Sequence, residues 1–495
     1  MKKINLILIT LVTSFISLST LSKASNSKES SRVEKHANAA EIFTNWHFFE
    51  NGRGMTISPN LSRFMWMLGE DPQAKEFKKE LIAKKEYENK ADFVTKFISK
   101  KYGFVIKEEK LMGVFNVQYK QMDVGVLGCT ACHSGKAAGV FVPGLGNKTI
   151  DTYAISRDVG RIQRFWGWGN RNEDYKYIHE KSMNFAKVTA DENISSLTRG
   201  LVPDSTIKTF FYKDHGIDYP KDMGRAQVKA PHLWGIKQKR SHGVFNDGSL
   251  SGDSYAWIFG AELFASDSGE HLRAVLPKIK WLTDEVLGNL LPPQYPFEIQ
   301  KDKVATGKVL FENNCMKCHG EHQRDQNGHP LYLAPKVIPK HIVKTDEEKL
   351  KAISPEFIKL VETGSLRDIL EFKEENIQKG YFAPKLWGVW SRFPYMHNGS
   401  IPSLYEVLLP PSERSAIFSM TDAGEEYRFD KERVGLTLFN KNEYKRKERE
   451  AKRGSREIYW IKREGQSNQG HYFEKSFSKL THSDRLALIE YLKTL

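Results

Sequence analysis

The most regular alternation of apolar and polar positions lies at the end of the chain. Four apolar residues between Leu486 and Leu495 recur about every three positions, which is typical of an amphipathic helix. Thr481 and Asp484 stand just before them with the spacing of a capping box. The pattern predicts a C-terminal helix that packs one face on another element.

A second helix is predicted within residues 307–320, GKVLFENNCMKCHG. Its apolar residues Val309, Leu310 and Phe311 directly precede a cysteine motif. Upstream, Leu291-Pro-Pro-Gln-Tyr-Pro296 cannot continue a helix, because proline lacks the amide hydrogen and clashes with the preceding turn. We therefore expect a domain boundary near residue 295.

The first residues, MKKINLILITLVTSFISLSTLSKA, combine two lysines, an apolar run from Ile4 to Leu18 and a small-x-small pattern that ends at Ala24. This run is shorter than the roughly 18 to 20 residues of a membrane span, so it predicts a signal peptide over residues 1–24. Residues 25–40 are polar and are expected to form a flexible lead-in. No later stretch is apolar enough for a membrane span, so we expect an exported protein, periplasmic or secreted, after cleavage.

The composition predicts a globular protein, because 12% of the 495 residues are aromatic and charged residues are well mixed. The net charge is +14, and a dense basic run, KRKEREAKRGSR, covers residues 445–456. Exported proteins seldom meet nucleic acid, and charge runs are usually solvated. We expect no nucleic-acid partner, and a surface insertion near residues 440–460 that could attract an acidic protein or an anionic membrane surface.

All four cysteines fall in two Cys-x-x-Cys-His motifs, which are Cys129, Cys132 and His133, and Cys315, Cys318 and His319. A zinc site would require both pairs to converge over 186 residues (315 − 129) and would leave the histidines unused. A redox dithiol would need one pair and no histidine. Cys-x-x-Cys-His is instead the attachment pattern of c-type haem, with two thioethers and an axial imidazole. The sequence predicts two covalently bound haem c groups, with His133 and His319 as iron ligands.

An internal repeat follows each motif. Ala230-Pro-His-Leu-Trp-Gly-Ile236 returns as Ala383-Pro-Lys-Leu-Trp-Gly-Val389, and Phe245-Asn-Asp-Gly-Ser-Leu250 returns as Met396-His-Asn-Gly-Ser-Ile401. Such a repeat indicates duplication. We predict a mainly α fold of two cytochrome c-like haem domains with long loops and insertions, one over residues 41–295 and one over residues 296–495.

The duplicated motifs, LPPQYPF and FPYMHNGSIPSLYEVLLP resemble the dihaem cytochrome c peroxidase superfamily. PGLGNKTID, HNGSIPSLYEVLLPPSER and SNQGH are most similar to the branch that includes the dihaem rubber oxygenases. In cytochrome c folds, the terminal helix crosses the helix before the haem motif, which implies the same for the two helices predicted above.

The resemblance implies a peroxidase-type oxidoreductase in which electrons pass from haem 2, at His319, to a peroxide-reactive haem 1, at His133. The implied donor is a small redox protein or a quinol-linked protein. Two alternatives stay open, a rubber-oxygenase-like enzyme that uses dioxygen to cleave an unsaturated hydrocarbon, and an electron-transfer cytochrome without substrate chemistry.

The resemblance also bears on the second ligand of haem 2. Family peroxidases use a methionine, but the corresponding position, fourteen residues beyond His397, is Pro411. Rubber oxygenases use a second histidine near the C-terminus, which makes His471 the expected ligand here. His397, Met396 and Met420 are the alternatives.

For haem 1, the detachable histidine of family peroxidases corresponds to Thr149, so we expect either an open coordination position there or a different capping group. Family peroxidases use a glutamate for proton transfer, and Glu262 or Glu270 could serve. Rubber oxygenases place apolar side chains there instead, a role open to Trp257, Phe259 and Phe264. Exposed carboxylates are an equally good interpretation of the two glutamates.

Electron transfer between the haems usually passes an aromatic side chain. Where family peroxidases have a tryptophan before the Asp-Gly pair, this chain has Asn246. The candidate replacements, each of which could equally be a core residue, are Trp234, Trp257, Trp387 and Trp390.

Overall fold

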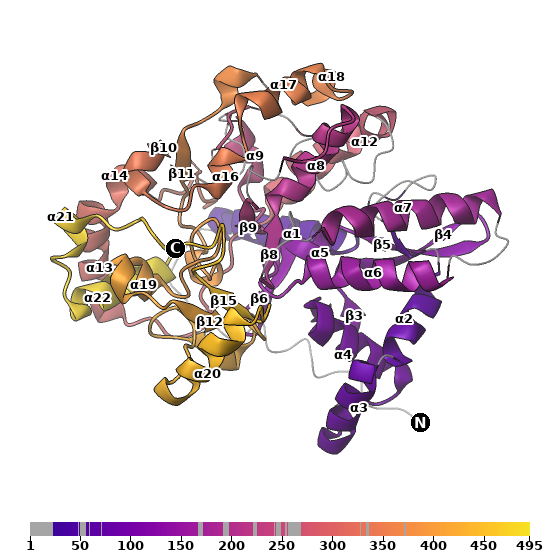
Figure 1. The fold of residues 1–495 in the computed structure, drawn as a ribbon. Helices are drawn as coiled ribbons and strands as arrows, with labels where there is room; N and C mark the ends of the chain where they lie inside the picture. Colours follow the sequence, from indigo (N-terminus) through magenta and orange to yellow (C-terminus); the bar gives the residue numbers. More distant parts are fainter. Residues whose placement is uncertain are drawn as a thin grey trace.

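Helices form most of the regular structure and gather in two groups that meet in the middle of the molecule (Figure 1). The computed structural model describes residues 23–495, apart from 48, 50–55, 59, 71, 167–171, 192–197, 221–224, 242, 244–248, 253–254, 256–268, 327, 333–335 and 371–372. Strands of the described part make seven small sheets, one of three strands and six of two. The mainly helical class is confirmed in this coarse form.

The first helix, α1 (Lys23–Thr44), corrects the expectation of a flexible lead-in over residues 25–40. Its end packs into the core, because Ala39 and Phe43 are buried. His36 accepts a hydrogen bond from the backbone N–H of Leu291 at 3.1 Å through its Nδ1. This segment has few apolar residues, so its sequence pattern does not predict a helix. Residues 1–22, most of the predicted signal peptide, lie outside the described residues.

The N-terminal group combines helices with a three-stranded antiparallel sheet of order β1-β5-β4, which leads straight into the first cysteine motif. Asn89 caps α4 by accepting from the N–H groups of Ala91 and Asp92, and Gly103 ends it in the left-handed conformation at φ 76°. The elements are β1 (Thr56–Ser58), α2 (Leu61–Glu70), α3 (Pro72–Lys84), α4 (Lys90–Tyr102), β2 (Ile106–Lys107), β3 (Lys110–Leu111), β4 (Val114–Tyr119) and β5 (Met122–Leu127).

The middle of the chain carries the first motif on a single helical turn and then two long helices that lie side by side (Figure 1). Its elements are α5 (Thr130–His133), β6 (Ser134–Ala137), β7 (Val140–Pro143), α6 (Thr152–Trp166), α7 (Glu173–Thr189), β8 (Leu201–Pro203), α8 (Asp204–Asp214), β9 (Gln227–Lys229), α9 (Ile236–Ser241) and α12 (Gly269–Trp281).

The C-terminal group begins with α13 (Lys301–Asn314), which runs into the second motif on α14 (Met316–His319). The predicted terminal helix is present as α22 (His482–Lys493), and its capping box of Thr481 and Asp484 is formed. It crosses α13 at Gly307, where an added Cβ would lie 2.0 Å from the carbonyl oxygen of Ala487. The crossing expected of a cytochrome c fold is therefore confirmed.

Short elements and loops fill the space between these two helices. They are β10 (Lys336–Pro339), α15 (Lys340–Val343), α16 (Glu348–Lys351), α17 (Pro355–Thr363), α18 (Arg367–Leu370), β11 (Gly380–Ala383), α19 (Leu404–Val407), β12 (Ile417–Ser419), β13 (Phe429–Asp430), β14 (Gly435–Leu436), α20 (Lys441–Lys452), β15 (Ile458–Trp460) and α21 (Glu474–Phe477).

One hydrophobic core continues across the predicted boundary near residue 295. It contains Trp234 from the first part and Trp390 from the second, both fully buried. At the boundary, Trp390 donates from Nε1 to the carbonyl oxygen of Pro293 at 2.9 Å. Arg456 and Asp151 form an ion pair at 2.7 Å between the two parts. The two parts thus share a core and polar contacts.

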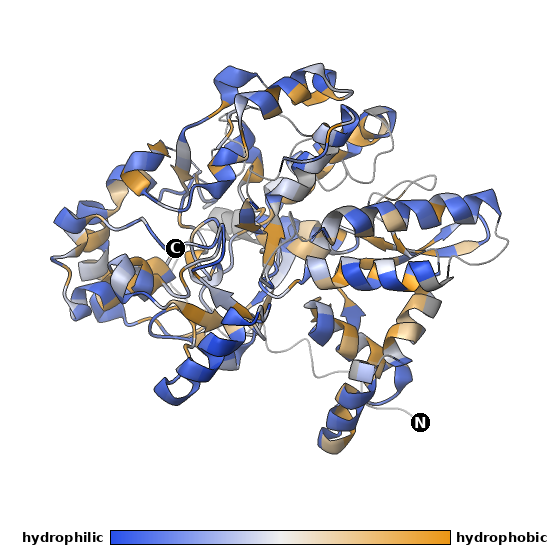
Figure 2. Cartoon of the chain, in the orientation of Figure 1, coloured by the Kyte–Doolittle hydropathy of each residue, from blue (hydrophilic) through white to orange (hydrophobic). Residues whose placement is uncertain are grey.

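The basic run forms α20, which is hydrophilic over most of its length (Figure 2). Its charges pair along the helix, as in the contact of Arg446 with Glu450 at 2.6 Å. This agrees with the interpretation as a solvated surface helix. No helix of the described residues is long and apolar enough to cross a membrane.

Candidate haem-binding site

Each Cys-x-x-Cys-His histidine is held by the repeat that follows its motif. His133 Nδ1 lies 2.9 Å from the carbonyl oxygen of Pro231, and His319 Nδ1 lies 2.8 Å from that of Pro384. Because a carbonyl can only accept, both Nδ1 atoms carry the proton and both Nε2 atoms keep a free lone pair. Pro231 and Pro384 are equivalent residues of the repeat, so both copies hold the histidine of their motif in the same way.

Burial keeps both rings in the neutral form that binds metal. Burial lowers the pKa of both His133 and His319 to about 4. The hydrogen bond of each ring to a backbone carbonyl raises its pKa, but by less than burial lowers it. Both imidazoles are therefore uncharged at neutral pH.

All four cysteines lie in the described part and none forms a disulfide. Burial raises the pKa of the Cys132 thiol to about 11 and, together with the nearby Cys318, that of Cys315 to about 12. A catalytic dithiol needs a thiolate near neutral pH, so these thiols do not fit that chemistry. Half-buried thiols beside a neutral imidazole, none of them in a disulfide, fit thioether attachment of a haem.

The second motif opens onto a cavity of about 620 Å³, a size typical of cofactor sites. Cys315, Cys318 and His319 line one side of it. All four sequence-predicted candidates for the second ligand also line it, namely His471, His397, Met396 and Met420.

His471 is the candidate that faces His319. Their ring centroids are 6.1 Å apart. Metal–nitrogen bonds of about 2 Å put the centroids of two opposed imidazoles roughly 6 Å apart, so this spacing leaves room for one ion between them. The ring of His397 stacks instead on Tyr381, with centroids 4.5 Å apart. His319 and His471 are therefore the two residues of this cavity that would hold a haem iron between them.

The loop before His471 is fixed by the motifs that carried the family resemblance. Arg414 donates from Nη1 to the carbonyl oxygens of Asn468 (2.6 Å) and Gly470 (2.8 Å). Asn398 donates from its side chain to the carbonyl oxygens of Gly465 (3.1 Å) and Ser467 (3.0 Å). Thus HNGS and PPSER hold the SNQGH segment in place.

The backbone at His471 also depends on a glycine. Gly470 has a φ of 83°, and an added Cβ would lie 2.4 Å from the carbonyl oxygen of Val343. The same carbonyl accepts from the His471 N–H at 2.8 Å. Burial, with the charges of His319 and Arg414, lowers the pKa of His471 to about 3 and keeps this ring neutral as well.

Seven lysine and arginine side chains line the same cavity, and none of them was predicted from the sequence. Burial lowers the pKa of four of them, Lys148, Lys229, Lys239 and Arg392. Burial lowers the pKa of Lys229 and of Lys239 to about 7, with the charge of Arg392 adding to it, and lowers the pKa of Arg392 to about 10. None of these four pairs with a carboxylate of the described residues, so the cavity has an unbalanced positive charge.

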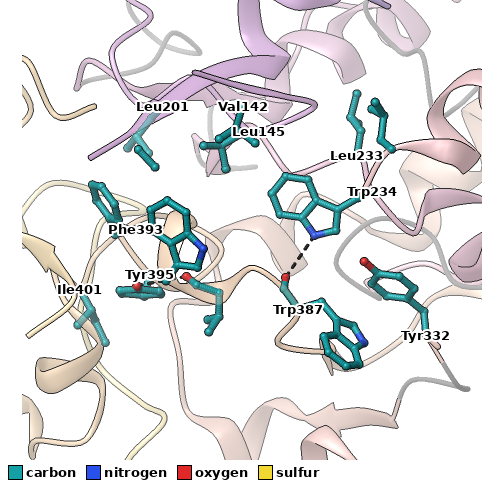
Figure 3. Packing of buried hydrophobic residues seen from close by; sticks show 14 of the residues in the cluster. Val142, Leu145, Leu201, Leu233, Trp234, Tyr332, Trp387, Phe393, Tyr395 and Ile401 are labelled. Carbon is teal, nitrogen blue, oxygen red and sulfur yellow. Dashed lines mark hydrogen bonds between the residues drawn. The ribbon is translucent and has the colours of Figure 1, made fainter. Parts of the chain in front are cut away.

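Two of the candidate electron-bridge residues meet between the repeats. Trp234 donates from Nε1 to the backbone carbonyl oxygen of Trp387 at 3.3 Å (Figure 3). Trp234 also lies against His232, with ring centroids 4.6 Å apart. Trp390 lies at the boundary segment, 5.5 Å from Tyr295 between ring centroids.

The candidates for haem 1 chemistry are not brought together in the described part. Thr149 donates from Oγ1 to the carbonyl oxygen of Gly103 (2.9 Å), so its hydroxyl is used in the fold. Glu270 lies in the first turn of α12 and is exposed. Glu262 and Trp257, like Phe259 and Phe264, lie outside the described residues.

Another residue missed from the sequence is His322. It accepts from the Leu386 N–H through Nε2 at 2.8 Å, and its ring lies 5.2 Å from that of Trp387. Together, His319 and His322 attach α14 to the second copy of the repeat. A usable signal existed for several missed residues, since Lys229 directly precedes one repeat copy and Arg392 follows the other.

Comparisons with known families agree with this arrangement. Residues 304–386 match the family model described as cytochrome c, and residues 380–419 match the model described as RoxA-like, cytochrome c-like. The C-terminal part of the chain thus contains a cytochrome c-like domain. Such domains bind haem c covalently, and the thiols of Cys315 and Cys318, the facing imidazoles and the cations of the adjoining cavity fit that group.

The chain is also similar to two uncharacterized proteins of Sinorhizobium fredii (strain NBRC 101917 / NGR234). It is 30% identical to y4iM over 158 residues, which are 27% of this chain and 35% of that protein. It is 25% identical to y4iJ over 264 residues, which are 42% of this chain and 41% of that protein. The matched stretches span less than half of either relative.

Proposed function

We propose that this protein is an exported dihaem c-type cytochrome oxidoreductase of peroxidase type, derived from a duplicated haem domain. Electrons would pass from haem 2, held by Cys315, Cys318 and His319, to a peroxide-reactive haem 1, held by Cys129, Cys132 and His133. The observation that carries this proposal is the pair of facing rings of His319 and His471, 6.1 Å apart.

A haem iron with protein ligands on both faces transfers electrons, whereas one with an open face can bind peroxide or dioxygen. Ligation by His319 and His471 would close both faces at the second motif. Substrate chemistry would then belong to the site of His133, whose Nδ1–H is fixed on Pro231 and whose Nε2 is free. The equal support of His133 and His319 by the repeat favours duplication.

The contact between Trp234 and Trp387 supports a route between the two sites. Pro231, which accepts from His133, and Trp234 belong to the same repeat copy, and Pro384, which accepts from His319, and Trp387 belong to the other. We infer that electrons cross at this contact. Both indole rings are buried, which excludes water from the route.

Electron entry is proposed at the exposed side of the second motif. Met316 is 37% exposed and Ile342 is 48% exposed, and Ile342 lines the mouth of the cavity. The exposed Lys317 and Lys336 line the same mouth. An apolar centre with cations around it fits a small redox protein with an acidic surface.

The RoxA-like match over residues 380–419 favours a second candidate, an oxygenase that cleaves an unsaturated hydrocarbon with dioxygen. The two candidates share the site of haem 2 and differ in what haem 1 binds. An electron-transfer cytochrome would lack an open site altogether.

The experiment begins with a haemochrome assay, for which we expect two haems per chain. An electron paramagnetic resonance spectrum should then show one low-spin and one high-spin centre. Half-reduced protein should consume hydrogen peroxide with a donor, whereas oxygen uptake with polyisoprene would support the oxygenase. Two low-spin centres without either activity would contradict both enzyme proposals.

A further inference from the structure

Four of the cavity cations, Lys148, Lys229, Lys239 and Arg392, lie near the contact between the two repeats, and two of them approach His232. Lys239 Nζ lies 3.4 Å from His232 Nε2, and Arg392 Nη1 lies 3.5 Å from the same atom. Lys229 donates to the carbonyl oxygens of Arg392 and Pro394, the latter at 2.7 Å. The group therefore brings several like charges into one enclosed space.

This group of cations destabilises the folded protein unless an anion binds among them. Buried cations lose their hydration, and like charges repel more strongly where the dielectric constant is low. The partners within the described part are carbonyl oxygens, a neutral imidazole and aromatic rings, none of which carries a full charge. Arg392 Nε is buried and has no hydrogen-bond partner among the described residues.

The position of the cations identifies the kind of anion. The same cavity is lined by Pro231, which supports His133, and by Cys318 and His319. Haem carries a pair of propionate carboxylates on the edge opposite its thioether bonds. Guanidinium and ammonium groups form short, charge-assisted hydrogen bonds with carboxylates.

We propose that Lys148, Lys229, Lys239 and Arg392 bind the propionate groups of the haems at the contact between the two repeats. This inference rests on the two haems of the proposed function. Positive charge beside a haem stabilises its reduced form, so these residues raise the reduction potential of the haem whose propionates they hold.

The test compares midpoint potentials of both haems by spectroelectrochemistry in the full, haem-loaded chain. The variants are Lys239→Met and Lys229→Met, in which an unbranched apolar side chain replaces the cation. Lys237→Met is the matched control. Lys237 lies on α9, as Lys239 does, but it is exposed and donates to the carbonyl oxygen of Asp284 (3.2 Å).

We expect the midpoint potential of at least one haem to fall by about 59 mV in each cavity variant. This shift corresponds to a tenfold change in the equilibrium constant of a one-electron reduction. The control should keep the native potentials. Unchanged potentials in both cavity variants would overturn the proposal, and so would a shift of the native potentials by inorganic phosphate, which would reveal a free anion site. Fewer than two haems in the native chain would instead reject the dihaem proposal itself.

Discussion

Arg414 donates a hydrogen bond to the carbonyl oxygen of Gly470, 2.8 Å away, and so fixes the residue before His471. The guanidinium is buried and also contacts Asn468, Glu406 and Leu409 through their carbonyl oxygens. Arg414 thus positions the proposed ligand His471, which lies 57 residues further along the chain (471 − 414).

Replacing Arg414 by lysine should loosen His471 without changing the ligand itself. Each lost charged hydrogen bond costs about 1.5 to 3 kcal/mol, and lysine cannot reproduce the planar fork. We expect a partial low-spin to high-spin conversion of haem 2 in the optical and paramagnetic resonance spectra. Arg449→Lys, on the exposed face of α20, is the control. A fully low-spin Arg414→Lys protein would show that the clamp is dispensable.

His471→Ala should open one face of haem 2. The expected result is a high-spin signal in place of the low-spin one, restored by added imidazole, because the cavity has room for the missing ring. His397→Ala is the matched control, since His397 lines the same cavity but stacks on Tyr381. If His397→Ala gave the high-spin signal and His471→Ala did not, the ligand assignment would be wrong.

Trp234→Phe removes the indole N–H that meets Trp387 and shortens the aromatic surface between the repeats. We expect slower electron transfer from haem 2 to haem 1, measured after rapid reduction of haem 2. Trp390→Phe carries a similar packing cost, roughly 1 to 3 kcal/mol for a buried side chain, and tests whether stability alone explains the effect. Equal rates in the two variants would argue against the proposed route.

The buried ion pairs of Asp204 predict acid sensitivity. Its side chain contacts Lys208 and lies 3.9 Å from Lys349, both of which are buried. Burial raises the pKa of Asp204, but the two lysines outweigh it and hold the pKa at about 2. Because the folded pKa is below the unfolded one, this group stabilises the fold above about pH 4, and the stabilisation is lost as the pH falls towards 2.

Asp204→Asn should therefore lower the free energy of unfolding at pH 7 by about 3 to 5 kcal/mol, since two buried lysines lose the negative charge of this carboxylate. The difference from the native protein should shrink between pH 4 and pH 2 in denaturant titrations. A difference that stays constant over that range would show that the carboxylate charge is not involved.

Gly307→Ala tests the helix crossing. Alanine favours an isolated helix by about 1 kcal/mol over glycine, whereas the contact with Ala487 opposes any side chain at this site. We expect the clash to win and the melting temperature to fall. Thr306→Ala, at an exposed neighbouring position of α13, should leave it unchanged or raise it. A stabilised Gly307→Ala protein would mean that α13 and α22 can move apart.

The residues proposed to anchor the cofactor could be named from the sequence, because their spacing is itself the chemistry. Cys315, Cys318 and His319 must be close together to hold one haem, and His471 was nominated from the resemblance to the rubber oxygenases. The cations could not be found in this way. Lys148 and Lys239 resemble any surface lysine until the fold encloses them. Their importance arises from burial and mutual distance, which no local pattern records.

Helix α1 was missed for a related reason. Its sequence is polar, and only its last turns carry apolar residues that pack into the core. The contact between His36 and Leu291 depends on a segment 255 residues away. The boundary prediction near residue 295 likewise relied on prolines and could not reveal the core that continues past it.

The pairing of His319 with His471 also has a consequence for the order of biogenesis. The two residues are 152 positions apart (471 − 319), so His471 is synthesised well after the cysteine motif. A haem attached at Cys315 and Cys318 would meet its first imidazole in the motif itself, and its second only after the segment around His471 has folded against the cavity. Folding of that segment would thus decide whether the iron stays open to peroxide or oxygen.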